Sequence, residues 1–415
     1  MMLNIRTTFL FMLMISAAPV FAQTLSLEQI LKEIEQNNPS LKGYESRIKS
    51  KEARVEGAGA WMPPMIGAGT FMTPYPGQGM IGEDDKGAFM ISAEQDIPNP
   101  AKIQARKAYL QTQSLTDFYG KTIRFNELRA KARELYFDLL IAYKKRGYQK
   151  ENQRIMQTMK KLAEIRYPLN QGNLNEIFKA EGRTYEAENM LLMTDGEIRS
   201  KKIALNALMN RNPTSGLQID TSISVTFNPI ADLDTIYFSE TRSDILHMQH
   251  DIHAMKANIN QMRQEAKPDF RIRFDHMANY SAMMPRQFTV MGMLTIPIAP
   301  WSSKMYKSEI KSMNFEITAM QSEKQGMLTE MLGMVKSMEN DIRTMQQQVS
   351  NYEKKILPAL NKNLNTSMLS YQENKGNLTM VIDAWETVNM AQLNYLDQLQ
   401  KFYQMIVEYE KNIER

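Results

Sequence analysis

Two hydrophobic periodicities alternate along the chain. In long stretches with few helix breakers, above all residues 102–166 and 303–370, apolar residues recur at steps of three and four, which predicts amphipathic helices. Shorter segments, most clearly 270–274 and 288–296, alternate apolar with polar or thioether residues, which predicts strands with one apolar face. We therefore expect a mainly α-helical protein with a small β part. Pro358 falls inside the second long helix, where we expect a bend or local unwinding.

Heptad spacing in two of the predicted helices indicates coiled-coil seams. The first seam consists of Ile245, Met248, Ile252, Met255, Ile259 and Met262. The second seam consists of Ile310, Met313, Ile317, Met320, Lys324, Met327, Met331, Met334 and Met338. Long antiparallel coiled-coil helices are therefore expected, and methionines in the seams are best interpreted as flexible apolar packing.

The sequence also contains two similar halves. Tyr167 and the Gly-Asn-Leu sequence at Gly172 recur 204 residues later as Tyr371 and the Gly-Asn-Leu sequence at Gly376. The match predicts an internal duplication in which each repeat has the order helix, strand hairpin, long helices. The predicted segments are a first repeat over 23–213 with a hairpin at about 64–97, a linker over 214–231, and a second repeat over 232–415 with a hairpin at about 269–296. The two Tyr-x4-Gly-Asn-Leu sequences are expected to be helix-to-helix turns, with glycine and asparagine suited to a helix end.

The amino terminus and the composition narrow the class of protein. Arg6 precedes an apolar run at residues 9–15 and a small-residue exit that ends at Ala22, which predicts a cleaved signal peptide over residues 1–22. The chain has no cysteine, so disulfides and thiolate metal ligands are excluded. A formal net charge of +4 without a dense basic run argues against nucleic acid as a partner. No phosphate-binding loop or HExxH sequence is present, and we expect neither an enzyme nor a bound cofactor.

Four short amphipathic strands in an exported chain have open edges and cannot close a barrel alone. Several chains would have to contribute strands to one barrel if the apolar faces met lipid. In this respect the chain resembles TolC-type outer-membrane factors, the exit ducts of tripartite efflux systems. The resemblance rests on the duplicated element order and on four sequence features. These features are Ile97-Pro98 with Ile296-Pro297, the segment 356–360, the two Tyr-x4-Gly-Asn-Leu sequences, and the alanines Ala180 and Ala384 that follow them.

The resemblance implies a homotrimer with a twelve-stranded outer-membrane β-barrel on a long periplasmic α-barrel. It also implies a periplasmic adaptor protein and an inner-membrane RND-type pump as partners, in the envelope of a Gram-negative cell. The family places acidic residues just before the alanine that follows the tip. Asp383 occupies one such position before Ala384, and Met380 stands where a second acid is often found, which makes both candidates for the channel gate. The competing interpretation is a coiled-coil or adhesin stalk, and the proline-bounded amphipathic hairpins argue against it.

Methionine is the feature that bears on the cargo. Between Met248 and Met345 the chain contains sixteen methionines against three leucines, although leucine is normally the commoner residue. Strand parity places Met291 and Met293 opposite the apolar face, and Met283 and Met284 fall in the loop before that strand. Thioethers are soft ligands that suit Cu(I), so these methionines are candidate contacts for Cu(I) or Ag(I) in transit. The alternative is a duct for drugs or other small molecules, in which methionine serves only for packing.

Histidine supplies a second set of candidate metal ligands. His247, His250 and His253 follow one another at steps of three, on the side of their helix away from the seam. They form either a metal-binding face or an ordinary solvated polar face. Because they point away from the seam methionines, the two kinds of ligand are not expected to share one compact site on an isolated helix.

Overall fold

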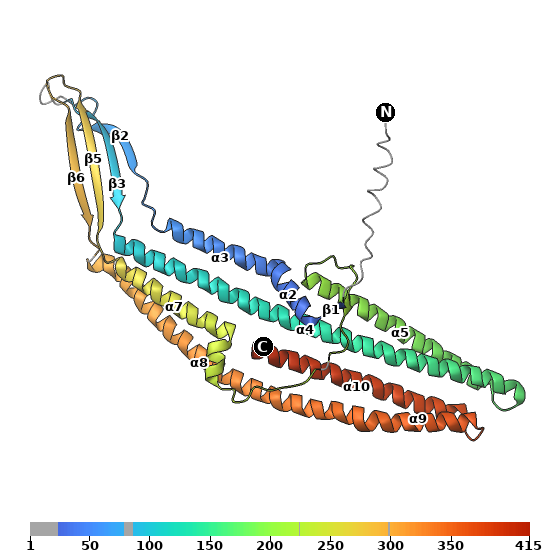
Figure 1. The fold of residues 1–415 in the computed structure, drawn as a ribbon. Coiled ribbons are helices and arrows are strands. Elements are labelled where there is room, and N and C mark those ends of the chain that lie inside the picture. The colour runs from blue at the N-terminus through green and yellow to red at the C-terminus, as the bar shows by residue number, and fades with distance from the viewer. Residues whose placement is uncertain (1–23, 79–85, 224, 298) are drawn as a thin grey trace, which may run out of the picture. The chain divides into compact units, whose positions relative to one another are not determined.

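The structure is a computed structural model that describes residues 24–78, 86–223, 225–297 and 299–415. The predicted signal peptide, residues 1–22, lies outside the described residues. The chain is mainly helical with a small β part, as its periodicity predicts (Figure 1). The helices are α2 (Leu27–Asn37), α3 (Pro39–Gly57), α4 (Pro100–Arg166), α5 (Leu174–Leu208), α6 (Thr235–Thr241), α7 (Ser243–Gln264), α8 (Pro300–Asn351), α9 (Leu357–Gln372) and α10 (Leu378–Asn412), with the short turns η1 (Tyr167–Leu169) and η2 (Tyr352–Ile356). The strands are β1 (Thr24–Leu25), β2 (Met65–Phe71), β3 (Ala88–Ile97), β4 (Gln218–Ile219), β5 (Asp269–Asn279) and β6 (Gln287–Thr295).

The chain divides into two compact units, and each unit combines segments from both predicted repeats. The first unit contains the described residues up to Lys42, together with Arg124–Asp234 and Met331–Arg415. The second contains Gly43–Ile123 and Thr235–Glu330. Both α4 and α8 contribute residues to each unit. The compact units are therefore not the repeats, whose boundaries stay a prediction.

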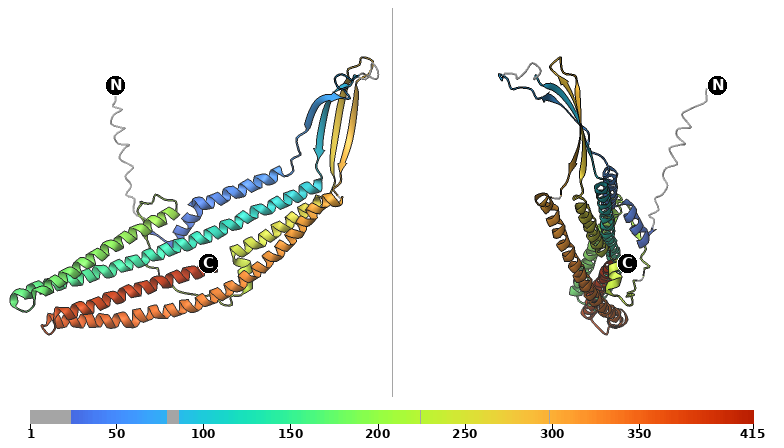
Figure 2. Two further views of the ribbon diagram at one scale, coloured as in Figure 1. Left: turned by 180° about the vertical axis from the view of Figure 1, so that it is seen from behind. Right: turned by 90° about the vertical axis from the view of Figure 1, so that its left-hand side faces the viewer.

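A four-stranded antiparallel sheet lies in the second unit. The strand order is β2-β3-β5-β6, so the two predicted hairpins join through the pairing of β3 with β5. Figure 2 shows the four strands side by side. Strands β2 and β6 each have only one neighbour in this sheet, and their outer edges carry backbone N–H and C=O groups without a strand partner among the described residues.

Helices α7 and α8 pack through the residues predicted for the two seams. Their apolar cluster consists of the buried Ile252, Ile259 and Ile317 with Met255, Ile310, Met313 and Met320 packed against it. Further along α8 the buried stripe leaves the predicted heptad, because Met334 is 38% exposed whereas Leu328 and Val335 are buried. An α-helix with 3.6 residues per turn drifts from a strict seven-residue repeat, and the sequence compensates by moving its apolar positions by one residue.

The core of the first unit lies where α4, α5, α9 and α10 come together. Met156 and Met159 of α4, Ala180 of α5 and Tyr371 of α9 are buried against one face of α10. That face consists of Leu378, Val381, Ile382, Ala384, Trp385 and Val388. Steps of three and four keep these side chains on one side of the helix, so the opposite side of its first turns is left exposed.

Both predicted helix-to-helix turns are confirmed, with a difference in their geometry. One turn joins α4 to α5 and the other joins α9 to α10. The residue in the left-handed conformation is asparagine rather than glycine, since Asn170 has φ 56° and Asn374 has φ 62°. Asparagine tolerates this region better than most residues, because its short side chain can hydrogen-bond locally. The next helix then begins after Asn377, whose Oδ1 accepts a hydrogen bond from the Met380 N–H at 3.0 Å.

The predicted linker belongs to the first unit and is ordered by contacts within it. Within it β4 pairs in parallel with β1, and Leu217 and Ile219 are buried. The Tyr136 hydroxyl of α4 donates to the Asp220 carbonyl at 2.6 Å, and burial raises the pKa of Tyr136 to about 12. Phe227 meets the ring of Tyr409 of α10 edge-on at 5.2 Å between centroids. These contacts order a segment that the sequence presents only as turn-rich.

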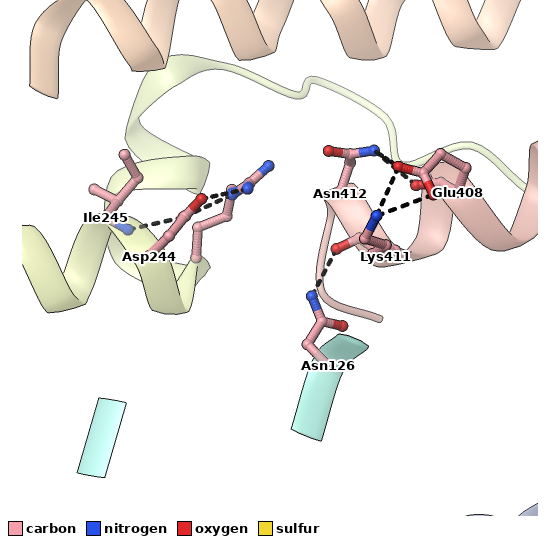
Figure 3. A network of polar contacts seen from close by, with 7 residues as sticks. Asn126, Asp244, Ile245, Glu408, Lys411 and Asn412 are labelled. Carbon is pink, nitrogen blue, oxygen red and sulfur yellow. Dashed lines mark hydrogen bonds and ion pairs between the residues drawn. The ribbon is translucent and has the colours of Figure 1, made fainter. Parts of the chain in front are cut away.

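The carboxyl end of α10 is fixed by polar contacts (Figure 3). The Asn126 side chain of α4 donates to the Lys411 carbonyl at 2.9 Å. The Lys411 ammonium contacts Glu408 at 3.0 Å, and the Asn412 side chain donates to the Glu408 carbonyl at 2.8 Å. The last four carbonyls of a helix lack intrahelical donors, and the Asn126 side chain supplies a donor to one of them, that of Lys411.

The expected interruption near Pro358 is a π-helical turn, η2 (Tyr352–Ile356), which ends two residues before the proline. Proline removes a backbone donor and crowds the preceding turn, and widening that turn relieves the clash. Glu353 within the turn accepts a hydrogen bond from the Tyr395 hydroxyl of α10 at 2.6 Å. None of the described helices is both long enough and apolar enough to cross a membrane.

Candidate conduction face and gate

The sheet has one face that is apolar and exposed. Residues directly opposite one another in adjacent strands share a face, so the pairing register assigns every strand residue to one side. The large apolar residues of this face are Ile66, Phe89, Ile91, Phe270, Ile272, Phe274, Phe288, Val290 and Leu294, all of them exposed, and Thr70, Gln95 and His276 lie among them. A contiguous apolar surface of this size marks a site that another protein or a membrane covers.

The opposite face, called here the polar face, carries ion pairs and thioethers. Its members are Met65, Gly67, Gly69, Phe71, Ala88, Met90, Ser92, Glu94, Asp96, Asp269, Arg271, Arg273, Asp275, Met277, Asn279, Gln287, Thr289, Met291, Met293 and Thr295. Arg271 contacts both Glu94 and Asp96 at 2.6 Å, and Arg273 contacts Asp275 at 2.9 Å. Three carboxylates thus share two guanidinium groups, and the face has no net positive charge from these residues.

The structure confirms the predicted parity of Met291 and Met293. Met291 lies opposite Arg273, and Met293 lies opposite Arg271, so both side chains belong to the polar face. Met291 is 46% exposed and Met293 is half-buried. Met283 and Met284 lie in the turn between β5 and β6, where both are exposed. Contact of these four methionines with a metal stays a prediction.

The three histidines of α7 do not form a uniform solvated face. His250 is half-buried and lies against the Tyr119 ring of α4 at 4.8 Å between centroids, while His253 is exposed. His247 Nδ1 lies 3.0 Å from an Asp251 carboxylate oxygen. Burial, and then the neighbouring His253, lowers the pKa of His250, which favours its neutral form.

The geometry of these histidines bears on their predicted role. His250 Nδ1 is buried and has no hydrogen-bond partner among the described residues. The rings of His250 and His253 lie 6.2 Å apart at a steep angle. Across the part of the chain that the structure describes, no three His, Asp or Glu side chains are grouped so as to hold a metal ion. Metal contact at His247, His250 and His253 stays a prediction.

The two gate candidates lie on the exposed side of α10. Met380 is 58% exposed, and Asp383 is exposed one turn further along. Asp383 borders a cleft of about 520 Å³ that is lined also by Leu360 of α9 and by Glu386 and Met390 of α10. Because the opposite side of the helix is buried in the core of the first unit, these side chains are free to meet solvent or another chain.

One residue of this region was not found from the sequence. The Arg166 guanidinium at the end of α4 lies 4.2 Å above the centroid of the Tyr371 ring at the end of α9. It also donates to the Gln372 carbonyl at 3.3 Å, and Arg166 is only 6% exposed. Arg166 therefore ties one helix-to-helix turn to the other. The repeat gives no signal for it, because the residue 204 positions later is Ser370.

Comparisons with known proteins identify the fold. A search of protein-family models finds no match, and neither does a search of curated proteins. Among solved structures, the outer-membrane channel OprN is 14% identical, with a TM-score of 0.74 over 93% of this chain and 89% of that chain. CusC, whose structures concern transmembrane channel formation, is 15% identical, with a TM-score of 0.72 over 93% of this chain and 91% of its own. VceC, an outer membrane protein of Vibrio cholerae, is 15% identical, with a TM-score of 0.70 over 93% of this chain and 95% of its own.

These similarities span nearly the whole described chain and nearly the whole of each neighbour. They confirm the resemblance to TolC-type outer-membrane channels at the level of the fold.

Proposed function

We propose that three copies of this chain form the outer-membrane exit duct of a tripartite efflux system. The observation that carries the proposal is the four-stranded sheet, which has an exposed apolar face and two open edges. In lipid every backbone polar group needs an internal partner, so a sheet that inserts must close on itself. Four strands are too few for a barrel, and three copies supply twelve. The fold shared with solved outer-membrane channels supports the same assembly.

In this assembly the apolar face meets lipid and the polar face lines the lumen. The described helices continue into the periplasm as a barrel of antiparallel coiled-coil helices, and the α4–α5 and α9–α10 turns form its inner end. Met380 and Asp383 act at that end as the gate, since they occupy the exposed side of α10. A periplasmic adaptor and an inner-membrane RND-type pump deliver the cargo. The duct is passive, so the chain performs no chemistry of its own.

The trimer is the first prediction that tests this proposal. Protein extracted from outer membranes in mild detergent is expected to have the mass of three chains by native mass spectrometry, and it should require detergent to stay in solution. A coiled-coil stalk would be extracted without detergent. A stable monomer that retains its full β content would contradict the architecture, because a lone sheet leaves the outer edge of β2 and the outer edge of β6 open.

For the cargo, we propose Cu(I) or Ag(I). Ion conduction requires many weak and exchangeable sites, so that entry is favourable and exit stays easy. Thioethers bind soft cations without the strong grip of thiolates, and this chain has no cysteine. Met283, Met284, Met291, Met293 and Met380 are the candidates on the path, and all of them are exposed except Met293, which is half-buried on the polar face. Efflux of drugs or other small molecules is the alternative.

The second prediction separates these cargoes. Replacing all five candidate methionines with leucine keeps apolar volume and removes sulfur, so tolerance of cells to copper and silver should fall severalfold while the trimer persists. A matched variant with leucine at Met255 and Met313, which lie in the α7–α8 apolar cluster, should keep full tolerance. If the five-leucine variant tolerates both metals as well as the parent does, methionine serves only for packing and the drug duct becomes the better proposal.

A further inference from the structure

Two further methionines lie directly opposite each other on the polar face. The register of β3 and β5 pairs Met90 with Met277. Side chains directly opposite in an antiparallel pair have Cβ atoms about 4.5–5.5 Å apart. Both methionines are half-buried and have flexible side chains with a terminal thioether. Two sulfur atoms therefore lie within reach of a single cation between the strands.

The surroundings explain this pair as packing only in part, because Phe71 and Ala88 lie one row away on the same face, whereas the pair's own row is open at its outer strands. On the outer strands its neighbours in the same row are Gly69 and Gln287, neither of which offers an apolar side chain. A Cβ placed on Gly69 would meet nothing within 4 Å, so the space beside Met90 is open. A packing methionine such as Met255 instead lies among buried isoleucines. The Met90–Met277 pair thus has open space at Gly69, on the side of the sheet that carries the charges.

Charge near the pair suits a cation. Asp275 is the next polar-face residue after Met277 along β5, and it is only 5% exposed. Arg273 contacts Asp275 and, at 4.0 Å, also Glu94, while Arg271 contacts Glu94 and Asp96. One carboxylate in excess of the guanidinium groups gives this part of the face a net charge of about −1. A monovalent cation is therefore attracted without being held by a dense acidic cluster.

A second pair lies further along the same face. Met291 and Met293 are two residues apart on β6, which places their side chains on one side about 6–7 Å apart. They lie opposite Arg273 and Arg271 respectively, whose positive charges are engaged by acidic neighbours. The polar face thus carries two thioether pairs at different levels along the strands.

We propose that Met90 and Met277 form a two-thioether contact for a soft monovalent cation, Cu(I) or Ag(I), and that Met291 and Met293 form a second such contact on the same face. This inference rests on the proposed function, because it takes the polar face as the wall of the duct. Two ligands per contact give weak binding, and two contacts at different levels allow a cation to pass from one to the other.

The test uses silver nitrate as the probe and the detergent-solubilised full-length protein labelled with ¹³C at its methionine methyl groups. Silver is expected to shift the methyl NMR signals of Met90 and Met277 together, with one common Kd. Sodium nitrate at the same concentration should shift neither signal. The signals of Met255 and Met313 in the α7–α8 cluster are internal controls and should stay in place. Single Met→Leu variants assign each signal.

The variant Met90→Leu decides whether the two sulfur atoms act together. In this variant the silver-induced shift of Met277 should need about tenfold more silver or more, because the second ligand otherwise acts at a high effective concentration. Met255→Leu is the matched control and should leave the Met277 titration unchanged. An unaltered Met277 titration in Met90→Leu, or no shift of either signal in the parent protein, overturns the proposal.

Failure of the site and failure of the proposed function can be told apart. A detergent-requiring trimer in which Met90 and Met277 ignore silver refutes the contact and leaves the duct standing. Paired silver shifts, together with unchanged cellular metal tolerance in a variant that adds Met90→Leu and Met277→Leu to the five leucine substitutions, support the contact and refute the metal cargo. A monomer by native mass spectrometry refutes the duct, while the methyl titration on that same sample still decides the contact.

Discussion

Arginine in place of Val290 is expected to abolish the proposed outer-membrane trimer, whereas arginine in place of its neighbour Thr289 is expected to be tolerated. Val290 lies on the apolar face and is 62% exposed, while Thr289 lies on the polar face opposite Asp275. A lipid-facing arginine near the middle of a membrane strand costs about 2–4 kcal/mol, and a trimer carries it three times. A loss of tenfold or more in trimer is expected, since about 1.4 kcal/mol corresponds to a factor of ten.

The matched pair makes the result specific, because the two positions are adjacent on β6 and receive the same residue. Membrane fractionation followed by native mass spectrometry measures the trimer in each variant. If Val290→Arg formed as much trimer as the parent protein, the apolar face would not meet lipid. Equal loss in both variants would show instead that β6 tolerates no arginine, and Val290→Leu then separates charge from shape.

A larger conductance is expected when Arg166 is replaced by alanine. The substitution removes a cation–π contact with Tyr371 and the donor to the Gln372 carbonyl, both at the turn where α9 ends. A partly buried cation–π contact is worth about 0.5–2 kcal/mol, and a hydrogen bond from a charged donor contributes about 1.5–3 kcal/mol. If the two turns constrict the duct, weakening their connection by this amount favours the open state about tenfold or more. Planar-bilayer recordings measure the effect.

Two further variants serve as controls for this prediction. Arg154→Ala removes an arginine from the same helix, where it is exposed and pairs only locally with Glu151, and it should leave conductance unchanged. Arg166→Lys keeps the charge but loses the planar group that lies over the ring, so an intermediate conductance is expected. Unchanged conductance in Arg166→Ala, with the trimer intact, would show that this contact is structural and does not hold the gate closed.

The sequence predicts those parts of the fold that depend on local periodicity. Alternation along 288–296 is enough to place Met291 and Met293 opposite the apolar residues, and the pairing register agrees. Heptad spacing likewise predicts which side of α7 packs on α8. In both cases each residue's orientation follows from its own strand or helix, and the partner only has to lie on the expected side.

Contacts between segments distant in sequence were not predicted. The pairing of β1 with β4, the ring of Tyr119 against His250, and Arg166 over Tyr371 each join elements that no local pattern connects. The prediction that Met334 packs in the seam was wrong for a different reason. It extended a strict heptad past the point at which a straight helix drifts out of phase with it. The Met90–Met277 pair was missed because it needs the register between two hairpins, which the sequence of either hairpin does not contain.

In the proposed trimer, the open edges of β2 and β6 would also govern how fast the duct forms. A single chain can complete its helices, but the rate at which its sheet closes depends on meeting two other chains and so rises steeply with their concentration. Until then, a newly exported chain of the proposed duct would present two strand edges to any other extended polypeptide around it. At low levels of production each chain therefore spends longer with its strand edges exposed. Chaperones that cover strand edges during that interval would raise the yield of assembled ducts.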